Sequence, residues 1–143
     1  MEPEINIRSA TPDDLAAVLA LEPRPDRAAS LEAAIASGRC LIALTGEDLA
    51  GFAIEGTFFG YPFLELLVVR EAHRREGIGS ALVEAWERTT SSDRVFTSTN
   101  RSNVAMQSLA EKAGYSRSGV LEGLDEGDPE IVYVKRLAYE ANP

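Results

Sequence analysis

Apolar and polar residues follow two periods along this chain, that of strands and that of helices. Strict alternation marks a strand near the N-terminus, and short unbroken apolar runs indicate strands with both faces covered. Apolar residues three and four positions apart indicate helices. The pattern predicts strands over residues 4–9, 39–45, 49–58, 63–69, 94–99, 116–124 and 130–137, and helices over 11–21, 27–38, 77–90 and 101–115.

The predicted helix boundaries carry signals of their own. Thr11 suits an N-cap, Pro12 suits the first helical position, and the two aspartates that follow suit the positive end of the helix dipole. Gly38 and Gly114 stand where helices end. The order β-α-α-β-β-β-α-β-α-β-β predicts one α/β (α+β) domain over residues 1–143. Its mixed, mostly antiparallel sheet would have about seven strands, flanked by about four helices.

Composition and charge narrow the functional classes. Apolar residues make up 45% of the 143 residues, which is enough for a core, and no apolar run approaches the roughly 18 residues of a membrane span. The N-terminus lacks the layout of a signal peptide, so we expect a cytoplasmic protein. A net charge of −9 argues against nucleic acid and membranes as partners and is compatible with a cationic substrate. The single cysteine, Cys40, lies in an apolar run and is expected to be a buried thiol.

Basic residues and two glycines meet in the stretch RREGIGS, residues 74–80, directly before a predicted helix. The first N–H groups of a helix bind anions, and glycines allow a phosphate to approach the backbone closely. A Walker A loop is excluded because the chain has no Gly-Lys pair, and Leu82 stands where a dinucleotide fingerprint needs Gly or Ala. The stretch therefore predicts a phosphate site or, alternatively, a tight turn that only begins the helix.

In its wider context, LLVVREAHRREGIGSALV resembles the signature of the GNAT superfamily of N-acetyltransferases, a valine followed by R/Q-x-x-G-x-G/A. A second family pattern, an asparagine before a helix that ends in glycine and an aromatic residue, is similar to a later part of the chain. The resemblance covers nearly the whole sequence and implies a single-domain GNAT-like fold. The matching residues are Val69, Arg74, Gly77, Gly79, Asn103, Gly114 and Tyr115.

The resemblance implies transfer of an acetyl group from acetyl-CoA to a primary amine, by direct attack in a ternary complex and without a metal. The pyrophosphate would bind the glycine stretch, the pantetheine arm would pair with a strand backbone, and Asn103 would bond to the arm. An ordinary helix cap is the alternative for Asn103. The residues expected at acetyl-CoA are Leu67, Val68, Val69, Arg74, Arg75, Glu76, Gly77, Ile78, Gly79, Ser80 and Asn103.

Glu65 is the candidate catalytic base. It interrupts the apolar run FLELLVV, and a carboxylate there is an exception because a buried charge is costly. The attacking amine must be neutral, but an alkyl amine has a pKa of about 10.4 and is therefore protonated at neutral pH. Several small-molecule GNAT enzymes carry a glutamate at this place. The alternative is an ion pair with an arginine on the sheet surface.

Two positions depart from the family pattern. Ala110 stands where many members have the tyrosine that acts as general acid, and Ser98 stands where some protein-acetylating members have a glutamate. We take Tyr115 as the candidate acid. Tyr133 and Tyr61 are alternatives, and the thiolate could also leave as an anion.

The loop LDEGDPE and the segment FFGYPF remain as candidates for the acceptor site. Asp125, Glu126 and Asp128 are expected to attract a cationic amine, with a solvated hairpin turn as the alternative. Residues 58–63 would form an aromatic wall, part of the core or a dimer contact.

Three functions stay open on the sequence. The first is acetylation of a small cationic amine, with a homodimer as an option that the resemblance offers. The second is acetylation of a protein N-terminus or lysine. The third is an acyl-CoA-binding sensor without turnover.

Overall fold

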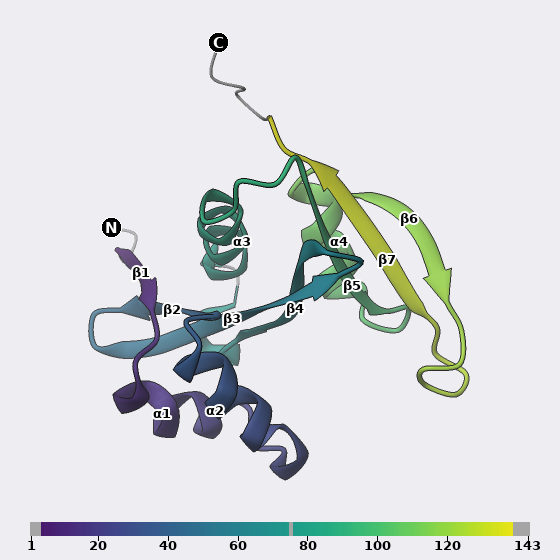
Figure 1. Ribbon diagram of the computed structural model, residues 1–143. Coiled ribbons are helices and arrows are strands. Elements are labelled where there is room, and N and C mark those ends of the chain that lie inside the picture. The colour runs from purple at the N-terminus through teal and green to yellow at the C-terminus, as the bar shows by residue number, and fades with distance from the viewer. Residues whose placement is uncertain (1–3, 75, 139–143) are drawn as a thin grey trace. The chain divides into compact units, whose positions relative to one another are not determined.

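The computed structural model describes residues 4–74 and 76–138, and its elements follow the predicted order (Figure 1). The strands are β1 (Ile5–Ser9), β2 (Cys40–Thr45), β3 (Asp48–Phe58), β4 (Tyr61–Val69), β5 (Arg94–Asn100), β6 (Ser116–Leu121) and β7 (Glu130–Arg136). The helices are α1 (Leu15–Leu21), α2 (Ala28–Ala36), α3 (Ile78–Arg88) and α4 (Val104–Lys112). In the part of the chain that is described, no helix is long and apolar enough to cross a membrane.

The seven strands have the order β1-β2-β3-β4-β5-β7-β6. Strands β1 and β2, β2 and β3, β5 and β7, and β6 and β7 pair antiparallel. Strands β4 and β5 pair in parallel over Phe63–Phe96 and Leu64–Thr97. The predicted mixed and mostly antiparallel α/β fold is therefore confirmed.

Several element boundaries differ from the prediction, and two of the differences have a clear local cause. Strand β4 begins at Tyr61 rather than at residue 63, because the chain reverses within two residues. Phe59 and Gly60 have φ angles of 51° and 81°, and a two-residue hairpin turn of this kind needs positive φ at both positions. Helix α4 begins at Val104 rather than at residue 101, because the Asn103 side chain caps it.

The chain divides into two compact units, one of residues 1–55 and 66–86 and one of residues 56–65 and 87–143. A single domain over residues 1–143 stays a prediction.

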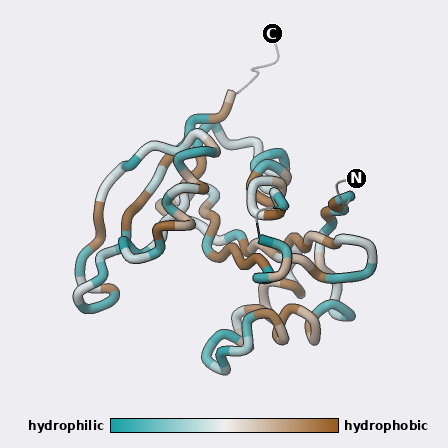
Figure 2. Tube along the Cα trace, turned by 180° about the vertical axis from the view of Figure 1, so that it is seen from behind, coloured by the Kyte–Doolittle hydropathy of each residue, from teal (hydrophilic) through white to brown (hydrophobic). Residues whose placement is uncertain are grey.

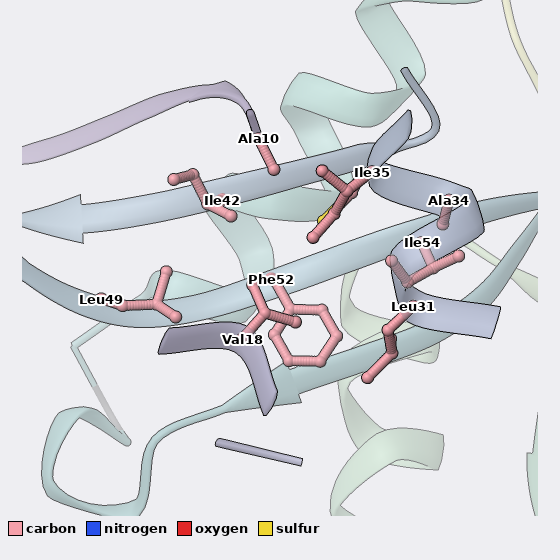
Figure 3. Close-up of a cluster of buried hydrophobic side chains, with 10 residues drawn as sticks. Ala10, Val18, Leu31, Ala34, Ile35, Ile42, Leu49, Phe52 and Ile54 are labelled. Atoms are coloured by element: carbon pink, nitrogen blue, oxygen red, sulfur yellow. The ribbon is translucent and has the colours of Figure 1, made fainter. Parts of the chain in front are cut away.

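In the first unit, α1 and α2 lie on one side of β2 and β3. Phe52 of β3 and Ile42 of β2 are 0% exposed and pack in one cluster with Val18 and Leu31 of the two helices (Figure 3). Cys40, at the start of β2, is 1% exposed, which confirms the buried thiol. This apolar cluster fixes β3 and thereby supports the strand beside it.

The opposite side of β3 meets α3. A Cβ atom built on Gly51 would lie 3.2 Å from the Ile78 side chain and 3.3 Å from that of Leu82. It would also lie 2.6 Å from the carbonyl oxygen of Val68, which is closer than real Cβ atoms approach. Glycine at this position therefore allows β3, β4 and α3 to pack closely.

The second unit contains β5, β7, β6 and α4. Tyr133 of β7 is 0% exposed, and Ala110 of α4 and Tyr115 are also buried. Every residue of β6 is exposed. The loop between β6 and β7 is mostly hydrophilic (Figure 2).

Candidate active site

The described part of the glycine junction, residues 74 and 76–80, follows a 3₁₀ turn at Glu71–His73 and includes the first residues of α3. Gly77 has a φ of 82°, a left-handed conformation that favours glycine. The amide of Ala81 donates to the Gly77 carbonyl at 3.0 Å, as the first turn of α3 closes. The preceding N–H groups, those of residues 78–80, have no acceptor further back within the helix. This end of α3 therefore offers a set of backbone donors to an anion.

Side-chain charge at the junction is arranged unevenly. Arg74 is exposed. The Glu76 carboxylate lies 2.8 Å from Nδ1 of the half-buried His73, which holds this negative charge beside the imidazole. Arg75 lies outside the described residues. Backbone donors and an exposed guanidinium are groups that bind a pyrophosphate, so the residues present fit the phosphate end of acetyl-CoA.

The strand segment that precedes the junction is anchored on β3. The amide of Arg70 donates to the Ala50 carbonyl at 2.7 Å, and Nε of Arg70 donates to the Leu49 carbonyl at 2.9 Å. The segment Leu67–Val69 is half-buried. Its backbone is thus held in an extended form, as main-chain pairing with an added ligand would require.

The Glu65 side chain is exposed, contrary to the expectation of a buried charge. The apolar neighbours in the sequence pointed to burial, but the burial of a strand residue depends on what covers its face. Among the described residues, Glu65 forms no ion pair, so the alternative of an arginine partner on the sheet surface is not seen there. Its carboxylate lies over Gly56 of β3, where a built Cβ would be 2.9 Å from Oε2. The catalytic role stays a prediction.

Asn103 has a clear local function. Its Oδ1 accepts a hydrogen bond from the Met106 amide at 3.1 Å, which caps α4. Asn103 therefore acts as an ordinary helix cap, the alternative that the sequence left open. A bond from Asn103 to the pantetheine arm stays a prediction.

Tyr115, the candidate acid, is 5% exposed and its hydroxyl donates to Oε2 of Glu87 at 2.7 Å. Nζ of Lys135 donates to Oε1 of the same glutamate at 3.0 Å. Burial, followed by the hydrogen bond to Glu87, raises the pKa of Tyr115. Because the phenolic proton of Tyr115 is donated to Glu87, these contacts favour a structural role for Tyr115. Its role as general acid stays a prediction.

The two alternative candidates for the acid, Tyr133 and Tyr61, differ from Tyr115. The hydroxyl of the fully buried Tyr133 has no hydrogen-bond partner among the described residues. Tyr61 is half-buried, with the Arg94 guanidinium 5.0 Å from its ring centre.

Two carboxylates of the acidic loop hold the loop in place. Oδ2 of Asp125 accepts from Nδ2 of Asn100 at 2.8 Å, and Asp128 accepts from the amide and the hydroxyl of Ser102 at 3.0 and 2.6 Å. The bonds from Ser102 lower the pKa of Asp128. Glu126 is exposed. Binding of substrate by these three residues stays a prediction.

Sequence reasoning missed two features of this region. The hydroxyl of Ser98 on β5 donates to Oε2 of Glu130 on β7 at 2.8 Å. Gly56 provides the space in which the Glu65 carboxylate lies. The only signal for the second was a glycine inside a strand pattern, which often marks a close approach.

A family model, the acetyltransferase (GNAT) family, matches residues 7–115. No curated protein matches the chain. Among solved structures, a GNAT-family acetyltransferase from Bacillus cereus has 33% identity and a TM-score of 0.88, over 93% of this chain and 97% of that one.

Two further solved structures are more distant. The ribosomal-protein-S18-alanine N-acetyltransferase from Escherichia coli has 20% identity and a TM-score of 0.78, over 97% of each chain. A protein from Salmonella typhimurium, solved with its cofactor acetyl-CoA, has 20% identity and a TM-score of 0.76, over 98% of each chain. These two share the fold. With the family model and the Bacillus cereus relative, the glycine junction places the chain in the acetyltransferase (GNAT) family.

Proposed function

We propose that the chain is an N-acetyltransferase that acetylates a primary amine of a small cationic molecule by direct attack in a ternary complex. The observation that carries the proposal is the glycine junction, where backbone donors of α3 and the exposed Arg74 fit a pyrophosphate. A structural relative is described with acetyl-CoA, which agrees with this donor.

When bound, acetyl-CoA supplies an activated acetyl thioester. The junction would hold its phosphates, and the backbone of Leu67–Val69 would hold the pantetheine arm. The exposed carboxylate of Glu65 is accessible to an incoming amine and would accept its proton. A base is needed because the amine is largely protonated at neutral pH.

The acceptor is proposed to be a small molecule because Glu65 is present while Ser98 and Ala110 occupy two positions where the family pattern carries other catalytic groups. Acetylation of a protein N-terminus or lysine is the alternative within the family. A sensor without turnover is the third option. It is supported by the Tyr115 hydroxyl, which already donates its proton to Glu87. A cytoplasmic location and a homodimer stay predictions.

The test combines calorimetry with acetyl-CoA and release of the CoA thiol over a panel of amines, amino acids and peptides. We expect binding, with turnover on at least one small amine. Binding without turnover on any amine would support the sensor, and absence of binding would contradict the phosphate assignment.

The Glu65→Gln variant tests the base. We expect turnover to fall by about 100-fold or more while acetyl-CoA affinity is unchanged. Glu47→Gln, in the exposed turn between β2 and β3, is the matched control and should behave like the parent. Unchanged turnover in Glu65→Gln would remove this residue from the mechanism.

A further inference from the structure

Gly56 is a strand glycine whose conformation does not explain it. Its φ lies outside the left-handed region that requires glycine. The space above it is filled, because a built Cβ would lie 2.9 Å from Oε2 and 3.4 Å from Cδ of Glu65. A Cβ atom this close forces a neighbour to move. Here the neighbour is the end of a flexible side chain, so the carboxylate would move rather than the backbone.

Two other strand glycines give the contrast. At Gly51 the nearest atom to a built Cβ is the Val68 carbonyl oxygen, at 2.6 Å, so a side chain there would disturb the sheet itself. At Gly119 on β6 nothing lies within 4 Å. Of these three positions, Gly56 is where an added methyl group would act on a functional side chain and leave the backbone in place.

Three rings form an aromatic cluster on the strands that carry Gly56 and Glu65 and on β5, namely Phe58, Phe63 and Phe96. The rings of Phe58 and Phe63 are stacked with centres 5.5 Å apart, and Phe58 lies 5.3 Å from Phe96. Phe58 is two residues from Gly56 on β3, and Phe63 is two residues from Glu65 on β4. Each pair therefore shares a face of its strand, about 7 Å apart along it.

All three rings of the aromatic cluster are only half-buried. We propose that Gly56 is a positioning residue that accommodates the Glu65 carboxylate beside the aromatic cluster, so that the site selects a primary amine carried on an aromatic group. The carboxylate would receive the amino group, and the rings would cover the apolar part. This inference rests on the proposed function, because it takes Glu65 as the group that receives the amine.

The first experiment compares Gly56→Ala with Gly119→Ala, the control in open space. For Gly56→Ala we expect kcat/KM for 2-phenylethylamine to fall by about 10-fold or more, with melting temperature and acetyl-CoA affinity close to those of the control. Calorimetry with 2-phenylethylamine and the free protein should show the same loss of affinity. A Gly56→Ala variant that matches the control in all readouts would overturn the positioning role.

The second experiment measures the coupling between Gly56 and Glu65, which a merely structural role of Gly56 would not produce. The double variant of Gly56→Ala and Glu65→Gln should lose no more activity than Glu65→Gln alone, since both changes act on one carboxylate. Additive losses would overturn the inference. If Glu65→Gln itself retains full turnover, the base assignment of the proposed function fails and the inference fails with it. A defect in Glu65→Gln but none in Gly56→Ala overturns the inference alone.

The aromatic preference is tested with 2-phenylethylamine against ethylamine, which lacks the ring. We expect a ratio of kcat/KM of about 10 or more, because the ring removes apolar area from water. The variant Phe63→Leu should lower this ratio. Equal use of the two amines would overturn the preference. Light scattering that shows a dimer converted to monomer by Phe63→Leu would assign the cluster to an interface between copies and would overturn it as well.

Discussion

Both units have apolar cores, but the second unit also buries hydrogen-bonded polar side chains. The interior of the first unit is an apolar cluster around Phe52, with Ile42 and Val18 also 0% exposed. In the second unit, buried Thr97 donates to the Leu64 carbonyl at 3.0 Å, and buried Tyr115 donates to Glu87. Apolar packing is weakened by loss of side-chain volume, whereas a buried hydrogen bond is weakened by loss of one partner. The unit that contains the glycine junction therefore depends mainly on close packing, and the unit that contains Glu65 depends on hydrogen bonds as well as on packing.

The largest effect should come from Phe52→Ala in the apolar core. Removal of a fully buried ring is expected to lower the free energy of unfolding by about 3–5 kcal/mol. Urea denaturation measures it. Phe59, which is 88% exposed, is the control, and its replacement by alanine should cost less than about 0.5 kcal/mol. A Phe52→Ala loss below that of the next variant would break the contrast between the units.

Glu87→Ala tests the polar core. It would leave the Tyr115 hydroxyl without its acceptor and Lys135 without its carboxylate partner. We expect a loss of about 2–3 kcal/mol in the free energy of unfolding, because removal of one partner leaves buried polar groups unsatisfied. A loss below about 1 kcal/mol would mean that water replaces the carboxylate and that these bonds do not support the second unit.

Tyr115→Phe removes one bond and keeps the pair between Lys135 and Glu87. The expected loss is about 1 kcal/mol, and Tyr133→Phe, whose hydroxyl has no described partner, should cost close to nothing. Thermal melts of the two variants make the comparison. Their turnover decides a second question, since unchanged kcat in Tyr115→Phe would exclude it as the general acid.

The smallest effect concerns an ion pair at the surface of the first unit. A hydrogen bond from Arg8 is the main cause that lowers the pKa of Asp14 from 3.8 to about 2. The pair therefore stabilises the fold above about pH 4, and this contribution is lost as the pH falls through about 2. Arg8 is 43% exposed, so the gain should stay below about 1 kcal/mol. Acid titration of unfolding should show this dependence in the parent and not in Asp14→Asn, and an equal dependence in both would assign it to other groups.

The fold was predictable because its elements are long and regular in hydrophobic period. The start of β4 was not, because the turn at Phe59 places an aromatic residue at a positive φ that usually calls for glycine or asparagine. The capped start of α4 at Asn103 was within reach of the capping rules but was placed too early.

The glycine junction could be located from spacing alone, since its residues are consecutive. The contacts of the second unit could not. Tyr115 meets Glu87 across 28 residues, and Lys135 meets it across 48. Such partners depend on strand register and on how helices cover the sheet, which no local pattern contains. The exposure of Glu65 was missed for the same reason.

The buried thiol of Cys40 has a practical consequence. It is the only cysteine of the chain, it is 1% exposed, and burial raises its pKa to about 12. Reaction with a disulfide dye requires an accessible thiolate, so the native protein should not react with such a reagent. The CoA released by turnover carries a free thiol of its own. Colour formed by native protein and both substrates, above that formed without the amine, therefore counts product, and a slow rise with the protein alone reports unfolding.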